Sequence, residues 1–270
     1  MPRRTLTLTS ALLLALASHS ARADTPQDCS PTTIGQLEDI LHVSEDHGSF
    51  TAAACKPAPW DSNTLIVAAA WSGTGQQPTT IILYATLNQR THSLIQSLET
   101  DIPGDPSSPD NSADNDPDDS TSSYTIDTAP YTLAPGIRAF GIRSSSNARG
   151  PSCADNSYSD SLTLFVPRQQ ALVPVFTANM SAQTARQGCI GTATGHDLWD
   201  SATLSIGIEK TTHHGYADLK ISARIQPGTN IHPHPKKYRP TPHTESLTLR
   251  YNGSEYPLPG DTTAPWWLTQ

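Results

Sequence analysis

The chain is poor in charged, aromatic and sulfur-containing residues. Of its 270 residues, 16% are charged and 6% are aromatic, and there are two methionines and four cysteines. A mainly helical protein usually carries more Glu, Lys, Arg and Leu, so this scarcity favours a β-rich chain. The longest apolar block, residues 6–17, is shorter than the ~20 residues of a transmembrane helix, and no membrane span is predicted.

The signature motifs of several enzyme classes are also missing. There is no G-x-S-x-G elbow, no H-E-x-x-H motif, no Walker loop and no G-x-G-x-x-G turn. This absence excludes only the families that carry such motifs, because catalytic triads can be assembled from distant positions. A hydrolase with a dispersed site would need His196 or His214 within hydrogen-bond reach of an aspartate, such as Asp197 or Asp218, and of a serine. No cofactor is predicted.

The first residues have the order of features that a secretory signal peptide requires. Arg3 and Arg4 precede the apolar block, and Ala21-Arg22-Ala23 offers a cleavage site before residue 24. We therefore expect residues 1–23 to be removed, and residues 24–270 to act in the periplasm or as a secreted protein.

The net charge of the chain indicates which classes of partner it can bind. The formal net charge is −8, and it becomes more negative without the leader, which carries three arginines and no acidic residue. Such a surface repels nucleic acids and anionic lipids, so neither is predicted as a partner.

The four cysteines are Cys29, Cys55, Cys153 and Cys189. An even number in an exported chain predicts two disulfides, and three pairings are open. No two cysteines have the C-x-x-C spacing of a zinc or redox site. The sequence-local pairing would close loops of about 25 and 35 residues, each of which stabilises by ~3–4 kcal/mol on the chain-entropy model.

Short runs of β-branched and aromatic residues recur along the chain. Strands are expected at residues 64–71, 79–87, 91–98, 124–128, 131–133, 137–143, 161–166, 171–176, 202–209 and 217–225. A final hairpin is predicted over residues 247–258, turning at Asn252-Gly253. The one helix is expected within residues 30–46, capped by Thr32 or Thr33 and ended by Gly48. The fold class is therefore mainly β: an antiparallel sandwich, barrel or stack of meanders of about ten strands, with one short N-terminal helix.

Residues 101–123 interrupt this pattern. They contain seven aspartates and four prolines. Such a composition buries too little apolar surface to offset its ordering entropy, and it predicts an acidic disordered insertion. Residues 24–270 then form one β-rich domain or two halves, 24–100 and 124–270. Calcium binding by the aspartates is the weaker interpretation, since the prolines would interrupt a backbone that wraps an ion.

Histidines and tryptophans offer two further candidates. His232 and His234 share one side of an extended chain, a spacing that can bind Zn²⁺ or Cu²⁺; the alternative is an exposed basic loop over residues 226–244. The tryptophans are spread along the chain as core fillers are, although they could instead form a platform for sugars. The terminal pair, Trp266 and Trp267, is expected to dock on the fold.

Three segments resemble a family of uncharacterised, exported bacterial proteins. They are Cys55-Lys56 with the apolar strand that follows, residues 128–141 (TAPYTLAPGIRAFG) and residues 247–253 (LTLRYNG). The resemblance implies an exported, β-rich protein and carries no activity. Together these features favour a non-enzymatic binding or interaction module of the cell envelope with a protein partner. The alternatives are a secreted hydrolase with a dispersed site and a periplasmic metal-binding protein that uses His232 and His234.

Overall fold

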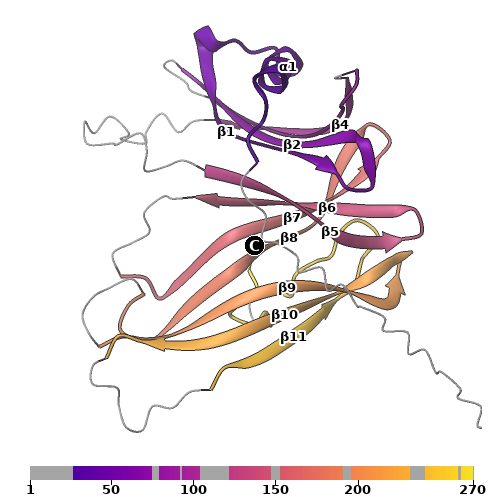
Figure 1. The fold of residues 1–270 in the computed structure, drawn as a ribbon. Coiled ribbons are helices and arrows are strands. Elements are labelled where there is room, and N and C mark those ends of the chain that lie inside the picture. The colour runs from indigo at the N-terminus through magenta and orange to yellow at the C-terminus, as the bar shows by residue number, and fades with distance from the viewer. Residues whose placement is uncertain are drawn as a thin grey trace, which may run out of the picture.

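The computed structural model describes residues 27–74, 79–91, 93–103, 122–146, 153–190, 196–231, 241–260 and 263–269. Within these residues the fold is mainly β with one short α-helix, as predicted (Figure 1). The elements are α1 (Pro31–Leu41), the 3-10 helix η1 (Glu45–His47), β1 (Gly48–Ala58), β2 (Asp61–Gly73), β3 (Thr79–Asn88), β4 (Leu94–Pro103), β5 (Ser122–Ala134), β6 (Ile137–Ser146), β7 (Asn156–Arg168), β8 (Ala171–Gln187), β9 (Leu198–His213), β10 (Tyr216–Thr229) and β11 (His243–Leu249).

Helix α1 lies within the predicted residues 30–46, but its N-cap comes two or three residues earlier and its end comes sooner than the sequence suggested. The Oγ of Ser30 accepts a hydrogen bond from the N–H of Thr33, so Ser30 is the N-cap, and the prediction of Thr32 or Thr33 is wrong. Pro31 follows it at the first helical position, where a missing N–H costs nothing. The helix ends at His42, in the left-handed conformation with φ of 54°, rather than at Gly48.

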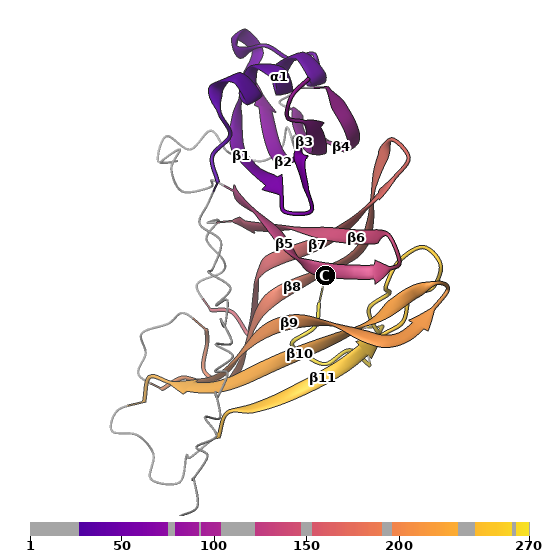
Figure 2. The same ribbon diagram turned by 45° about the vertical axis from the view of Figure 1, so that its right-hand side comes forward.

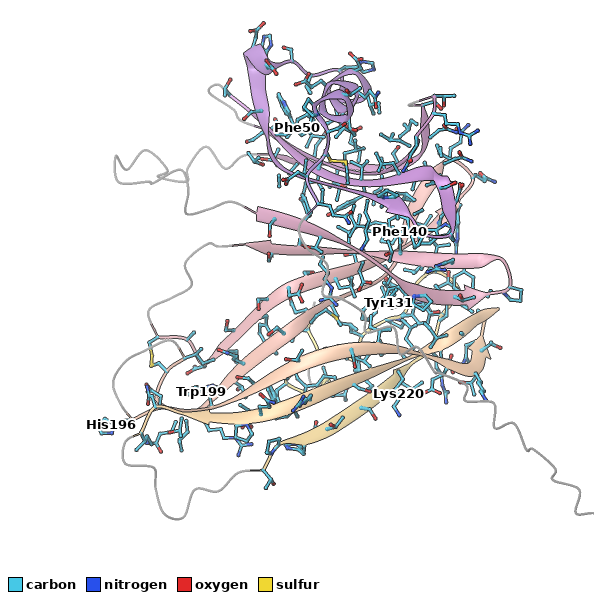
Figure 3. The ribbon with its side chains drawn as sticks, in the orientation of Figure 1. Phe50, Tyr131, Phe140, His196, Trp199 and Lys220 are labelled. Atoms are coloured by element: carbon cyan, nitrogen blue, oxygen red, sulfur yellow. A yellow bond between two sulfur atoms is a disulfide. The ribbon has the colours of Figure 1, made fainter. Side chains whose placement is uncertain are left out.

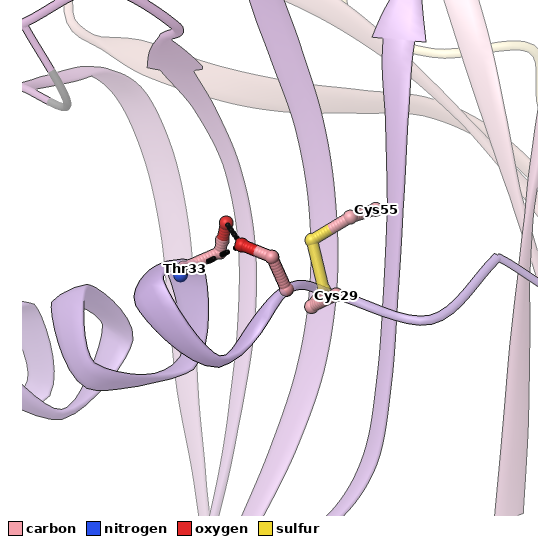
Figure 4. The surroundings of a disulfide bond; sticks show 4 residues. Cys29, Thr33 and Cys55 are labelled. Carbon is pink, nitrogen blue, oxygen red and sulfur yellow. Dashed lines mark hydrogen bonds between the residues drawn. A yellow bond between two sulfur atoms is a disulfide. The ribbon is translucent and has the colours of Figure 1, made fainter.

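The cysteines form the sequence-local pairs Cys29–Cys55 and Cys153–Cys189, each with Cα atoms 4.9 Å apart. Figure 4 shows that the first disulfide joins the residue before the Ser30 cap to β1, so it ties α1 to the sheet that the helix covers. The second joins the chain ahead of β7 to the chain after β8, and so closes the open end of that hairpin. The first disulfide therefore constrains a connection that no strand pairing holds, and the second lies beside an isolated β-bridge between Ala154 and Ile190 and reinforces it.

The strands form one strongly bent sheet that branches at β8. Its main path runs in the order β1-β2-β3-β4-β8-β7-β6-β5, and β9, β10 and β11 continue from the other end of β8. All pairings are antiparallel except the single contact between β4 and β8, at Ser97 and Ala171. Figure 2 shows the result: β1–β4 and α1 form one layer, β9–β11 form the opposite layer, and β5–β8 lie between them.

Alternating side chains divide the interior into three cores. On β2, Val67 and Ala69 face α1, whereas Ile66 and Ala68 face β5 and β6. Because both faces of β2 are buried at residues 66–71, its sequence is an unbroken apolar run there. The third and largest core lies between β7–β8 and β9–β11, and Trp267 near the C-terminus completes it. We call the core between β2 and the β5–β6 pair the middle core. Of the residues labelled in Figure 3, Phe140 belongs to the middle core and Tyr131 to the third core.

Strand β5 joins two predicted strands into one. Its pairing with β6 shifts register between Asp127 and Tyr131, where the chain reads Thr128-Ala129-Pro130. The Asp127 carboxylate accepts hydrogen bonds from the Ala129 N–H and the Tyr131 hydroxyl, both at 2.9 Å, and so holds this bulge. The bulge re-aims the strand, so that its first half faces the middle core and its second half faces the third.

The acidic segment is bounded by two strands. Strand β4 ends at Pro103 and β5 begins at Ser122, so the strands extend into both ends of the segment predicted at residues 101–123. Residues 104–121 lie outside the described residues, as do residues 1–26, which contain the predicted signal peptide.

Candidate functional site

The branch point of the sheet leaves one edge of β8 without a neighbouring strand. Strand β7 pairs along one side of β8, from Asn156 to Arg168. On the other side, β4 touches only Ala171, and β9 begins to pair at Ser181. Residues 172–180 therefore present a bare edge in the middle of the sheet, since β4 departs toward one layer and β9 toward the other (Figure 2).

The C-terminal segment, residues 251–260 and 263–269, covers this edge at two points. The Tyr256 N–H donates to the carbonyl of Val175 at 2.7 Å, and the Asn179 N–H donates to the carbonyl of Thr269 at 2.9 Å. The Asn179 side-chain amide adds a bond to the Thr269 hydroxyl at 3.3 Å. Between these anchors, which are four residues apart on β8, the segment leaves the strand and returns to it.

Buried aromatic side chains hold the segment in place. The Tyr256 hydroxyl donates to the carbonyl of Ala217 on β10 at 2.6 Å. Trp267 is 1% exposed, and its indole N–H donates to Glu245 on β11 at 2.7 Å. Trp266 is half-buried beside it, so the terminal tryptophan pair docks on the fold as predicted.

A cavity of about 830 Å³ lies between the edge of β8 and the C-terminal segment. Its volume falls within the range of ~300–1,000 Å³ that is usual for ligand sites. Prolines and aromatic rings make up about half of its lining residues, and Glu255 is the one charged lining residue; the rings and prolines are Tyr158, Phe176, Tyr256, Trp266, Pro174, Pro257, Pro259 and Pro265. No histidine, cysteine or lysine of the described residues lines it. The cavity therefore presents aromatic rings and prolines together with polar backbone and side-chain groups.

Thr177 lies at the centre of the bare edge and lines the cavity. The pairing of β8 with β7 is regular from Thr177 to Asn179, so the peptide groups alternate in direction along this stretch. Since the Asn179 N–H points toward the C-terminal segment, the N–H and C=O of Thr177 point the same way. Among the described residues, no backbone hydrogen bond reaches Thr177 from that side.

A separate polar cluster lies at the β9–β10 turn. His213 Nδ1 is 2.7 Å from Asp218 Oδ1, and the Thr211 hydroxyl donates to Asp218 Oδ2 at 2.7 Å. Burial alone would raise the pKa of Asp218, which is 2% exposed, but the bonds from Thr211 and His213 and the nearby charge of Arg250 outweigh it and lower the pKa. No serine, threonine or cysteine of the described chain is hydrogen-bonded to His213. The arrangement braces the turn.

The residues proposed for a dispersed hydrolase are not brought together. His196 and His214 are both exposed, and neither makes a side-chain hydrogen bond to an aspartate within the described residues; Figure 3 shows His196 at one end of the molecule. Asp218 bonds to His213 instead, because Thr211, His213 and Asp218 share a face of the hairpin. Asp197 is held by Asn230, whose side-chain amide donates to it at 2.6 Å.

The predicted metal ligands, His232 and His234, lie outside the described residues. Elsewhere in the described part of the chain, no group of three or more His, Cys, Asp or Glu side chains is arranged to hold a metal ion.

Sequence reasoning missed the cavity, although one signal was present. Pro257, Pro259 and Pro265 follow one another closely, and proline cannot donate to a sheet ladder. That spacing is typical of a chain that runs past a sheet edge without pairing with it as a full strand.

Comparisons with known proteins add no assignment. No family model matches the chain, and neither curated proteins nor solved structures give a match. Within the described residues, no helix is long and apolar enough to cross a membrane.

Proposed function

We propose that this chain is an exported, disulfide-stabilised binding protein of the cell envelope or extracellular space, and that its ligand occupies the cavity beside β8. The observation that carries the proposal is the cavity itself: its volume suits a ligand, and its walls combine aromatic rings and prolines with a bare strand edge. The two disulfides and the leader-like residues 1–23 support export, since disulfides persist in oxidising compartments.

Binding is favoured over catalysis by the separation of the titratable groups from the cavity. The His213–Asp218 pair lies at the β9–β10 turn, and neither residue lines the cavity. Glu255 is the one carboxylate on the wall. Among the described residues, no second carboxylate or histidine lines the cavity and could form an acid–base pair with it.

The proposal is tested by NMR with defined probes. Libraries of linear peptides, oligosaccharides and small fragments are titrated into the ¹⁵N-labelled protein, and the indole N–H of Trp266 and the amides of residues 172–180 are monitored. We expect at least one probe class to shift these signals and to lose affinity in Trp266→Ala, whereas Trp60→Ala, at the exposed β1–β2 turn, leaves binding unchanged. Probes that shift only signals remote from β8 would contradict the proposal.

Two controls address the alternatives. N-terminal sequencing of the exported protein should begin at residue 24, and recovery of the intact chain from the cytosol would contradict export. Generic ester, peptide and glycoside substrates should not be turned over. A turnover that disappears in His213→Ala would favour the hydrolase.

A further inference from the structure

We infer that the ligand of this cavity is an extended peptide segment of a partner protein, which binds as a short added strand along β8 at Thr177. The inference rests on the proposed function and names the chemical class of its ligand. It starts from backbone groups: the N–H and C=O of Thr177 face the cavity, and no described backbone group bonds to them from there. A strand edge of this kind is the template to which an extended peptide adds.

The two anchors of the C-terminal segment define how much peptide can pair. Val175 and Asn179 already bond to the segment, and only Thr177 between them offers a donor and an acceptor. Four residues of strand span about 14 Å, so a few peptide residues fit between the anchors, and one of them exchanges both backbone bonds with Thr177. A small rigid ligand would satisfy one of these groups, whereas a peptide residue satisfies both.

The walls determine which side chains the peptide carries. Tyr158 and Trp266 present rings, and the prolines present flat apolar surfaces, so apolar or proline side chains of the peptide pack against them. Glu255 is exposed and is the one charged residue on the wall, and the whole chain carries a net charge of −8. Charge complementarity therefore favours a peptide with Lys or Arg next to its apolar residues.

The test uses a phage-displayed library of random linear peptides, panned on the full exported protein. We expect enrichment of peptides that combine apolar residues with Lys or Arg. The tightest peptide is then measured by calorimetry against wild type and Thr177→Pro, with Trp60→Ala as the control outside the cavity. Proline removes the N–H that faces the cavity and no N–H of the β7 ladder. We expect Thr177→Pro to weaken binding by about tenfold or more, and Trp60→Ala to bind like wild type.

A second measurement leaves the protein unchanged. Each residue of the peptide is N-methylated in turn, and one position should lose binding by about tenfold while its two neighbours retain it, since alternate peptide groups point away from β8. This series decides the question if Thr177→Pro fails to fold. Uniform tolerance of N-methylation, or full binding by Thr177→Pro, would overturn strand addition.

The outcomes separate this inference from the proposed function. If peptides bind through Trp266 but tolerate every N-methylation, the binding function stands and the added strand is wrong. If no peptide is enriched while oligosaccharides or fragments shift Trp266, the peptide class is wrong and the binding function stands. If no probe class reaches the cavity, both fail.

Discussion

Tyr256 is bonded through its backbone to Val175 of β8, with its N–H 2.7 Å from the carbonyl oxygen. The chain that follows β11 therefore crosses to a different part of the sheet, and the hairpin predicted over residues 247–258 does not form. Gly253 has φ of 105°, but Asn252 is not in the left-handed region that a type I′ turn requires at both central residues. The Asn252 side chain instead accepts bonds from the N–H groups of Ser254 and Glu255, and the Asn252 N–H donates to the Glu255 carbonyl, so the chain makes a local turn before it reaches β8.

The first prediction concerns the Tyr256 hydroxyl, which fixes this crossing. It donates to the carbonyl of Ala217 at 2.6 Å in a buried setting, and burial raises the pKa of Tyr256, so the hydroxyl stays protonated. Tyr256→Phe leaves a buried carbonyl without this donor, and we expect the free energy of unfolding in urea to fall by ~1–1.5 kcal/mol. Tyr158→Phe is the matched control: Tyr158 is 39% exposed, its hydroxyl has no hydrogen bond within the described residues, and its removal should cost less than ~0.5 kcal/mol. Equal losses in the two variants would contradict the assignment.

The sequence indicated the fold class because its strongest signals are local. Residues 64–71 and 79–87 lie within β2 and β3, where runs of β-branched and apolar residues reflect burial on both faces. Strand β1 was missed because its sequence, GSFTAAACKPA, is rich in alanine and lacks β-branched apolar residues. Its place in the sheet comes from the apolar face of β2 and from the disulfide, neither of which is a local property.

The cavity could not be predicted because it depends on long-range pairing. The chain that follows Asn252-Gly253 can pair either with β11, which would give the predicted hairpin, or with the bare edge of β8. That edge exists only because β4 and β9 diverge. The His213–Asp218 pair shows the same limitation on a smaller scale. The aspartate was recognised as a partner, but a register shift between Ala217 and Leu219 decides which neighbouring histidine it meets.

The second prediction concerns the disulfides. The bonded cysteines are 26 and 36 residues apart, and the chain-entropy model gives ~3–4 kcal/mol for each closure. We expect Cys29→Ser/Cys55→Ser and Cys153→Ser/Cys189→Ser each to lose about this much unfolding free energy in urea. Wild type in reducing agent should match the variant that lacks all four sulfurs. Thiol labelling of the denatured, unreduced protein should find no free cysteine, and a reactive pair would contradict the pairing.

The third prediction concerns two glycines in different backbone conformations. Gly188 has φ of 73°, and a Cβ there would collide with Asp197 Oδ1. Gly188→Ala must strain the backbone and displace a buried carboxylate, and we expect a loss of ~2 kcal/mol or more. Gly35 lies inside α1 with no atom near its Cβ position, so Gly35→Ala should stabilise the protein by ~0.5–1 kcal/mol through helix propensity. Melting temperatures that move in opposite directions confirm the contrast, and a tolerated Gly188→Ala would refute it.

The fourth prediction concerns the pH dependence of Asp218. Because its pKa in the folded protein is below the ordinary value of 3.8, its contribution to stability is complete above that value and is lost as the pH falls through the lowered pKa. Asp218→Asn keeps the shape of the side chain but removes the charge that Thr211 and His213 bind, so at pH 7 we expect a loss of ~1.5–3 kcal/mol in unfolding free energy. The difference between wild type and variant should begin to narrow below the ordinary value of 3.8, where the carboxylate of the unfolded chain takes up a proton, and should close as the pH falls through the lowered pKa of the folded carboxylate. Asp61→Asn serves as the exposed control, since Asp61 also has a lowered pKa through its bond with Thr64 but lies in solvent, and screening there should leave stability nearly unchanged. A difference at Asp218 that is constant from pH 7 to pH 3 would show that the side chain acts through packing alone.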